Sequence, residues 1–257
     1  MFNFLSGNIN RKRERVYRFI THSSNNYTVG SGFFISKHGG FLTCFHVAFK
    51  SELRQIRQNP DFQKITGNDE HSKLKVFYKT LIIKSEVEFP DSSRYVAELI
   101  DFDERFDIAF FKVRVDPSKV KVCRIDWNSS FNYTDNVFFG GFPTQPYYQS
   151  DKFPFAVHEG IVSSFVEMEI GGSKYQHVMI NSVNLGGNSG APLFRRRGSG
   201  VMGIINGNMN WGRDDLIGQD KAKGYVPVSL RTPLSIAYAT PMKLLKEFIF
   251  ETLKKCK

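Results

Sequence analysis

The chain has 257 residues, of which 41% are apolar and 14% aromatic, and its 35 basic and 25 acidic side chains give a formal net charge of +10. This apolar content is sufficient to bury a sizeable core. Because no run of about eighteen apolar residues occurs, a membrane-spanning helix is not expected. The first 15 residues lack the apolar segment of a secretory signal, so export is not expected either.

Three cysteines, at positions 44, 123 and 256, are too few for a disulfide framework, and we therefore expect a cytoplasmic protein in a reducing compartment. The positive charge is compatible with nucleic acid, acidic protein or anionic lipid as a partner. The basic clusters lie far apart in the sequence, however, and no nucleic-acid-binding motif accompanies them. We interpret the charge first as a contribution to solubility, and the sequence does not indicate an oligomeric state.

The first half of the chain shows mainly strand patterns. Residues 1–15 are predicted to form a mobile basic arm. From Val16 onward, apolar and polar residues alternate between Gly- and Asn-rich turns, which predicts strands. Apolar residues spaced by four and three positions predict a short helix over 48–58, followed by a polar connection over 61–72. The strands predicted in this half are 16–21, 28–36, 41–44, 74–78, 81–89, 94–102 and 107–115.

The second half begins after a polar, turn-rich segment at 117–134, and we divide the chain into β units at 16–120 and 121–257. The strands predicted in the second unit are 136–141, 155–170, 175–183, 201–206 and 236–239. Residues 207–232 show little periodicity and are predicted to form a long loop that becomes ordered when a substrate binds.

The chain closes with a predicted helix, for which Thr240 is the N-cap and Pro241 the first helical residue. Its apolar stripe is expected to pack against the second β unit. Many short strands at hairpin spacing, with few helices, predict an all-β architecture of two halves.

The stretch at 184–194, with the sequence NLGGNSGAPLF, surrounds Ser189 with glycines. One interpretation is a hairpin turn rich in Gly, Asn and Ser. The other is a nucleophilic serine on a tight turn, with neighbouring N–H groups pointing in the same direction, as an acyl-transfer enzyme requires. This stretch alone does not decide between the two.

A serine nucleophile needs a base that a third group orients. His46 ends an apolar strand where the chain turns into a helix, as a site-facing residue would, although a structural histidine fits the same position. Asp107 heads a very apolar strand, where a buried carboxylate is costly unless it is hydrogen-bonded. The alternative for Asp107 is an exposed turn. The order His46, Asp107, Ser189 is that of a chymotrypsin-type triad.

Five segments, in order along the chain, carry a family resemblance: GSGFFISKHGGFLTCFHV (30–47), FDIAFFKV (106–113), GIVSS (160–164), GNSGAPLF (187–194) and GVMGIIN (200–206). They resemble the signatures of trypsin-like peptidases of the HtrA/DegP kind, and the match runs over about residues 16–250. The resemblance implies two six-stranded antiparallel β-barrels of the chymotrypsin type, which together form one protease domain with its site in the cleft between them.

The resemblance also implies roles for individual residues. His46 would be the general base, Asp107 would orient the imidazole and stabilise the imidazolium, and Ser189 would be the nucleophile. The backbone N–H groups of Gly187 and Ser189 would form the oxyanion hole. No cofactor is implied, and no metal is expected, because Cys44 and His46 are too sparse a set for zinc.

Some residues depart from the family pattern. Asn188 stands where secreted digestive relatives have an aspartate that pairs with a freed N-terminus, so activation by that cleavage is not expected. Val47 replaces a disulfide cysteine, and Ala191 replaces a usual glycine. No PDZ module follows the protease unit in this sequence, so we do not carry over the regulation that such modules provide.

By the same resemblance, Val183, six residues before Ser189, should line the base of the P1 pocket. Four consecutive residues should form one side of it: Gly203, Ile204, Ile205 and Asn206. No acidic side chain stands among these positions to receive Arg or Lys. The sequence therefore predicts a preference for small or medium apolar P1 side chains.

The first functional interpretation is a serine endopeptidase that acts on protein or peptide substrates through an acyl-enzyme. Two alternatives remain open. One is a catalytically inactive, protease-like scaffold that binds peptide or nucleic acid. The other is a viral-type processing protease with a narrow sequence preference.

Overall fold

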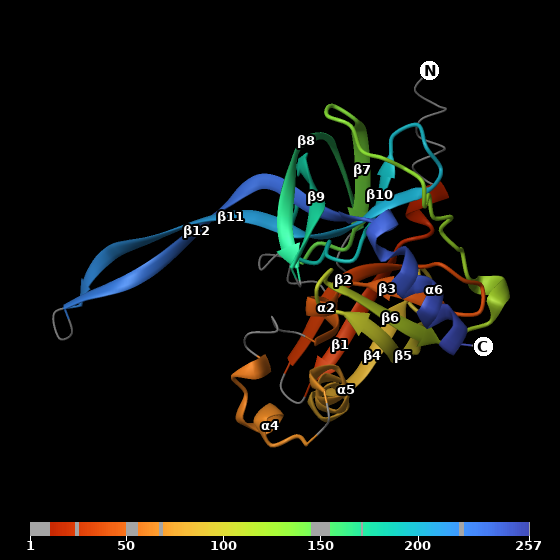
Figure 1. Cartoon of the computed structure of the whole chain (residues 1–257), viewed down its shortest axis with the longest axis horizontal. Coiled ribbons are helices and arrows are strands. Elements are labelled where there is room, and N and C mark those ends of the chain that lie inside the picture. Colours follow the sequence, from red (N-terminus) through yellow and green to blue (C-terminus); the bar gives the residue numbers. More distant parts are fainter. Residues whose placement is uncertain are drawn as a thin grey trace.

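The computed structural model describes residues 11–23, 26–49, 56–66, 69–144, 155–170, 172–220 and 224–256. Within this part of the chain, the strands close into two antiparallel barrels, one above the other in Figure 1. The predicted all-β architecture of two six-stranded barrels is therefore confirmed.

The first barrel has the strand order β1-β2-β3-β6-β5-β4. Its strands are β1 (Tyr17–Ser23), β2 (Asn26–Phe34), β3 (Gly40–Thr43), β4 (Ile82–Glu88), β5 (Arg94–Asp103) and β6 (Ile108–Val113). The second barrel has the order β10-β11-β12-β9-β8-β7. Its strands are β7 (Asn136–Gly141), β8 (Ala156–Ile170), β9 (Ser173–Asn181), β10 (Pro192–Arg195), β11 (Val201–Asp220) and β12 (Gly224–Pro241).

Helices occupy the connections and the end of the chain. They are α2 (Phe45–Phe49), α4 (Pro60–Gln63), α5 (Glu70–Leu81) and α6 (Lys246–Lys255), with the short 3₁₀ helices η1 (Pro117–Lys119) and η2 (Met242–Leu245). In the described residues, no helix is both long enough and apolar enough to span a membrane.

The first barrel is filled by aromatic side chains because the inward positions of its alternating strands are mostly phenylalanine. The fully buried rings are Phe19, Phe33, Phe34, Phe41, Phe110 and Phe111. Phe34 and Phe41 meet edge to face, with ring centroids 5.0 Å apart, a favoured aromatic arrangement. This packing supports the end of β3, which leads into the helix that carries the candidate histidine, and the start of β6, which follows the candidate aspartate.

The strand predicted at 74–78 is wrong, because these residues lie within helix α5. Leu74, Phe77 and Tyr78 are buried on one side of the helix. Their spacing of three and four residues is that of a helical stripe, whereas the short apolar run 74–78 taken by itself fits either structure. The expected polar connection at 61–72 likewise contains α4 and the start of α5. The predicted helix at 48–58 falls partly outside the described residues.

The long loop predicted at 207–232 is also wrong. Its described residues continue β11 and β12 as an antiparallel pair, with Asn210 opposite Pro233 and Leu216 opposite Pro227. In Figure 1 this two-stranded extension projects far beyond the second barrel. A ladder of backbone hydrogen bonds needs no apolar alternation, so periodicity did not reveal it.

The C-terminal helix differs from the prediction in its start and in its packing. Thr240 and Pro241 end strand β12, and α6 begins only at Lys246, after η2. The helix contacts the first barrel, as an ion pair of Lys255 with Asp101 of β5 shows, and its Phe250 ring also meets Trp127 of the segment between the barrels, with ring centroids 5.2 Å apart. The Lys112 side chain of β6 also donates a hydrogen bond to the Cys256 carbonyl, at 3.4 Å. The helix therefore ties the end of the second barrel back to the first.

The predicted basic arm lies partly outside the described residues, and the remainder, 11–15, is not a free arm. Lys12 is only 4% exposed. Its ammonium group donates to the Gly198 carbonyl and lies over the rings of Phe138 and Phe194, 4.4 and 5.0 Å from their centroids. Burial, with Arg15 nearby, lowers the pKa of Lys12 to about 8. The arm is thus anchored to the second barrel where this lysine is buried.

Candidate active site

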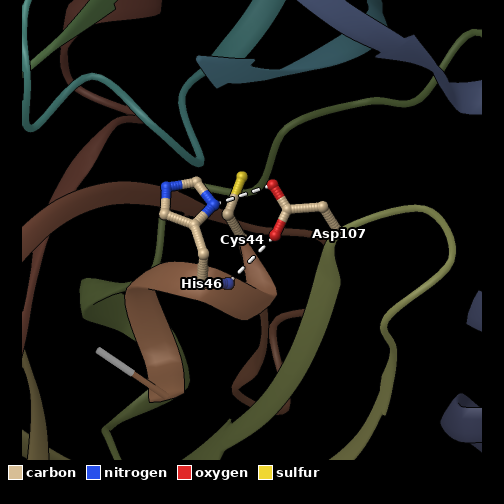
Figure 2. A group of neighbouring side chains, drawn as sticks. All are labelled: Cys44, His46 and Asp107. Carbon is tan, nitrogen blue, oxygen red and sulfur yellow. Dashed lines mark hydrogen bonds and ion pairs between the residues drawn. The ribbon is translucent and has the colours of Figure 1, made fainter. Parts of the chain in front are cut away.

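His46 and Asp107 of the first barrel are joined by two hydrogen bonds. The ring Nδ1 of His46 lies 2.8 Å from Asp107 Oδ2, and the His46 backbone N–H donates to Asp107 Oδ1 at 2.9 Å (Figure 2). A carboxylate that accepts from both the ring and the backbone fixes the imidazole orientation and its Nδ1–H tautomer. The other ring nitrogen, Nε2, is then the atom that can accept a proton.

The position of each partner follows from local structure. His46 lies in the short helix α2, directly after β3, and Asp107 ends the turn before β6. The backbone of Asp107 has φ +54, in the left-handed region, where aspartate is more common than most residues but still strained. This conformation turns the carboxylate toward α2, while the Asp107 carbonyl accepts from the Phe45 N–H at 3.2 Å.

Ser189 lies on a turn that requires two of its glycines. Gly187 and Gly190 have φ +95 and +89. A Cβ on Gly190 would lie 2.0 Å from the Ser31 carbonyl oxygen, and one on Gly187 would lie 2.3 Å from the Phe142 carbonyl oxygen. Glycine is therefore needed for both conformation and space. The stretch 184–194 is not a hairpin turn, because β9, which precedes it, and β10, which begins at Pro192, are not neighbours in the barrel.

Ser31 of the first barrel holds this turn, and the sequence did not identify it. Its N–H donates to the Ser189 carbonyl at 2.8 Å, and its hydroxyl donates to the Gly187 carbonyl at 2.8 Å. The same hydroxyl accepts from the Phe142 N–H at 3.0 Å. Ser31 lies within the GSGF segment of the family resemblance, which could have drawn attention to it. A serine in a predicted strand does not by itself indicate a hydrogen-bond partner in the other barrel.

Two residues bring Ser189 near the histidine and aspartate. A Cβ on Gly30 would lie 2.4 Å from Val47 and 3.2 Å from the Ser189 carbonyl, so the nucleophile turn and helix α2 flank Gly30. The backbone carbonyl of Asn206 accepts a hydrogen bond from the Ser189 hydroxyl at 2.9 Å. The side-chain Nδ2 of Asn206 donates to Asp107 Oδ2 at 3.2 Å. His46, Asp107 and Ser189, the three residues predicted from the sequence, thus all lie where the two barrels meet.

The backbone at this turn offers donors for an anion. Among the described residues, no protein acceptor is bonded to the N–H of Gly187 or of Ser189, whereas the neighbouring Asn188 N–H is bonded to the Leu185 carbonyl at 3.2 Å. Two such N–H groups on one turn form the type of site that stabilises a developing oxyanion.

Asn188 is fully buried, and a histidine stands beside it. Its Nδ2 lies 3.1 Å from His158 Nε2. Burial lowers the pKa of His158, so this ring stays neutral and accepts the amide hydrogen. Asn188 therefore has a neutral partner in the second barrel, in contrast to the charged partner that an aspartate would need.

Cys44, His46 and Asp107 are the one group of three His, Cys, Asp or Glu side chains in the described residues whose donor atoms could reach one ion, and these atoms lie within 4.8 Å of one another. Burial and the nearby Asp107 raise the pKa of the Cys44 thiol, which donates to the Ile205 carbonyl at 3.2 Å. A thiol held in this protonated form is a poor ligand for zinc.

The predicted pocket residues differ in how exposed their side chains are. Ile204 and Ile205 are fully buried in apolar cores, so only their backbone could contact a substrate, and their assignment to a pocket wall stays a prediction. The inward side chains of β11 fill the barrel because a strand inside a closed barrel has few free faces. Gly203 pairs with Pro241 in the ladder, and Asn206 contacts Asp107. Val183 is 53% exposed and stays available to a substrate.

Comparisons with known proteins agree with this fold. Residues 30–204 match a family model described as a trypsin-like peptidase domain. No curated protein sequence matches significantly. Among solved structures, the HtrA-type protease AlgW with a tripeptide has a TM-score of 0.62 at 18% identity, over 95% of this chain and 61% of the other. The serine endoprotease from Yersinia pestis has a TM-score of 0.62 at 19% identity, over 97% and 66%. The chain thus spans less than two thirds of the length of either protein.

Proposed function

The chain belongs to the family of trypsin-like peptidases, and from this premise we propose that it is a serine endopeptidase that hydrolyses peptide bonds through an acyl-enzyme. The observation that carries the proposal is the pair of hydrogen bonds from His46 to Asp107, next to a serine on a glycine-lined turn. Positioned base and nucleophile are the parts that acyl transfer needs.

In the first step, Ser189 Oγ attacks the carbonyl carbon of the scissile bond, and its proton passes to His46 Nε2. Asp107 stabilises the imidazolium that forms. The C–N bond then breaks, and the leaving amine takes the proton from Nε2. For this step the serine hydroxyl has to turn from the Asn206 carbonyl, to which it now donates, toward His46.

Hydrolysis of the acyl-enzyme reverses these roles. Water attacks the ester carbon, gives its proton to His46 Nε2, and Ser189 Oγ recovers that proton as the acid leaves. In both steps the N–H groups of Gly187 and Ser189 would stabilise the oxyanion. Removal of one such donor in enzymes of this kind costs about 2.7–4 kcal/mol of transition-state stabilisation.

We also propose a preference for small or medium apolar P1 side chains. The support is the exposed apolar side chain of Val183, six residues before Ser189. Profiling with a peptide library tests this preference, and preferred cleavage after Arg or Lys would contradict it. The proposed substrates are proteins or peptides. The three cysteines are free, and we propose a reducing, cytoplasmic environment, which cell fractionation tests.

The activity itself is tested by labelling with a fluorophosphonate probe. The wild-type protein and a Ser129→Ala variant, in which a serine far from the turn is changed, should both be labelled. Ser189→Ala should not be labelled, and its peptide hydrolysis should fall by a factor on the order of 10⁴ or more. Absence of any Ser189-dependent label and hydrolysis would instead favour an inactive scaffold that binds peptide or nucleic acid. Cleavage restricted to a single sequence would favour the narrow processing protease.

A further inference from the structure

The hydrogen bonds at Asp107 continue into the second barrel and reach a second buried histidine. Asn206 Nδ2 donates to Asp107 Oδ2 at 3.2 Å, and Asn206 Oδ1 lies 2.8 Å from Thr240 Oγ1. Thr240 Oγ1 in turn lies 3.2 Å from Nδ1 of His177, on strand β9. All three residues beyond Asp107 are at most 4% exposed. A continuous polar chain therefore crosses an otherwise apolar region.

The neighbours of Asn206 determine which way its side-chain amide points. Nδ2 faces the carbonyl oxygens of Phe106 and Asp107, both at 3.4 Å, as well as the Asp107 carboxylate. All of these groups only accept hydrogen bonds. The amide oxygen is therefore the atom that faces Thr240, and the Thr240 hydroxyl donates to it.

The direction of the next bond follows from this assignment. A threonine hydroxyl has one hydrogen, and its two acceptors are Asn206 Oδ1 at 2.8 Å and the more distant Phe106 carbonyl at 3.4 Å, neither of which is a donor atom. His177 Nδ1 therefore carries the hydrogen of its own bond to Thr240. Every donor in the chain from His177 through Thr240 and Asn206 thus points toward the Asp107 carboxylate. Hydrogen bonds in series with this common direction polarise one another.

The tautomer of His177 has a consequence for its far side. With hydrogen on Nδ1, Nε2 is a bare acceptor, and this atom is buried and without a partner among the described residues. Burial lowers the pKa of His177 and keeps the ring neutral, although the charge of Asp107 opposes this effect. A buried polar atom without a partner destabilises the fold, and an apolar side chain on this strand would avoid that loss.

We propose that His177 is a positioning residue for the active site, which acts through Thr240 and Asn206 to hold the Asp107 carboxylate toward His46. This inference rests on the proposed peptidase function and adds residues of the second barrel to it. The relay donates to Asp107 Oδ2, the same carboxylate oxygen that accepts from His46 Nδ1. It therefore couples side chains of the second barrel to the base on the first.

The test is a series of variants that removes one link at a time: Asn206→Leu, Thr240→Val and His177→Phe. Around metal ions, removal of a partner that orients a ligand costs about 10–100-fold, and we take this range as a guide for a carboxylate that orients a histidine. We expect kcat to fall by about 100-fold, tenfold and threefold, in order of distance from Asp107, with little change in KM. The NMR resonance of the His46 Nδ1 hydrogen should shift in the same order.

Two conservative variants separate positioning from packing. His177→Asn keeps an N–H donor near the place of Nδ1, and Thr240→Ser keeps the hydroxyl. Both should recover most of kcat and of the His46 resonance position. The control is Thr252→Val, because this buried hydroxyl donates to the Phe248 carbonyl within α6, at 2.8 Å, and to no group of the active site among the described residues. It should lower the melting temperature without moving the resonance.

The proposal is overturned if kcat and the resonance follow the melting temperature across all variants, including Thr252→Val. It is also overturned if His177→Phe leaves both unchanged. A wild-type protein that neither hydrolyses peptides nor binds the fluorophosphonate probe would contradict the proposed function. The His46 resonance would still test the relay in that case, because it does not depend on turnover.

Discussion

The two barrels have the same strand topology but hold their parts of the site in different ways. In the first barrel, large aromatic rings fill the core and support the strand ends that carry His46 and Asp107. In the second barrel the core is smaller and built mainly from aliphatic side chains, and Ser189 lies on a glycine turn. Packing thus positions the base, whereas backbone contacts from the other barrel position the nucleophile.

The largest difference between the barrels should appear when one core side chain of each is shortened. Phe41→Ala in the first barrel should cost about 3–5 kcal/mol of unfolding free energy, because it leaves a large cavity among fully buried rings. Val178→Ala in the second barrel should cost only about 2 kcal/mol, since it removes two methyl groups at about 0.8 kcal/mol each, plus a small cavity. Chemical denaturation measures both, and equal losses would contradict this contrast.

The turn that carries Ser189 should be destabilised by any added side-chain atom, because its glycines lie close to neighbouring backbone. Gly190→Ala should cost about 2–4 kcal/mol and abolish probe labelling, because the new methyl would meet the Ser31 carbonyl in a left-handed conformation. The matched control is Gly172→Ala, which has φ +77 but no atom within 4 Å of the new Cβ. It should cost about 1–2 kcal/mol and leave labelling intact. Labelling of Gly190→Ala at the wild-type rate would refute the prediction.

The support that the first barrel gives to the nucleophile turn should depend strongly on the Ser31 hydroxyl. Ser31→Ala removes the bonds to Gly187 and Phe142 and leaves these backbone groups without their partner. We expect a loss of about 1–3 kcal/mol and slower probe labelling, because the turn loses its support. Ser36→Ala, at a turn where the hydroxyl accepts from the exposed His38 N–H, should change stability by less than about 0.5 kcal/mol. Denaturation and labelling rates measured together would separate the two.

The smallest expected effect is a difference between the pH ranges over which the two barrels lose stability. In the second barrel, burial lowers the pKa of His158 and His177 from 6.5, so the folded state favours their neutral forms. Their contribution to stability is therefore complete above pH 6.5 and is lost as the pH falls through their lowered values. Protonation of His158 also removes the acceptor for Asn188, so labelling should slow over the same range.

In the first barrel, burial on its own raises the pKa of Asp101, but hydrogen bonds from Lys255, Lys75 and His71 outweigh it and hold the value at about 2. This contribution is present above the ordinary value of 3.8 and is lost only as the pH falls toward 2. Amide hydrogen exchange as a function of pH should show the second barrel opening first. His158→Gln should weaken the pH dependence of exchange in the second barrel, and Asp101→Asn should weaken it in the first. If both barrels opened over the same pH range, the prediction would be contradicted.

Local sequence determined much of this protein. The alternation of apolar residues predicted most strands of both barrels, and glycines around Ser189 predicted a turn with unusual backbone angles. The family resemblance then related His46, Asp107 and Ser189 to one another before any contact between them was known. These features can be predicted from the sequence because strand periodicity, turn composition and short motifs depend on residues that are close together in the chain.

Other features depend on residues far apart, and only the tertiary structure decided them. Thr240 has the local pattern of a helix N-cap, yet it lies in strand β12 and its hydroxyl donates to Asn206 on the neighbouring strand β11. Ser31 resembles any strand serine until the opposite barrel supplies its partners. Helix α6 could have packed on either barrel, and the ion pair with Asp101 lies on the first. A hydrogen-bonding side chain satisfies whichever partner the fold brings near, and the sequence around it does not specify that partner.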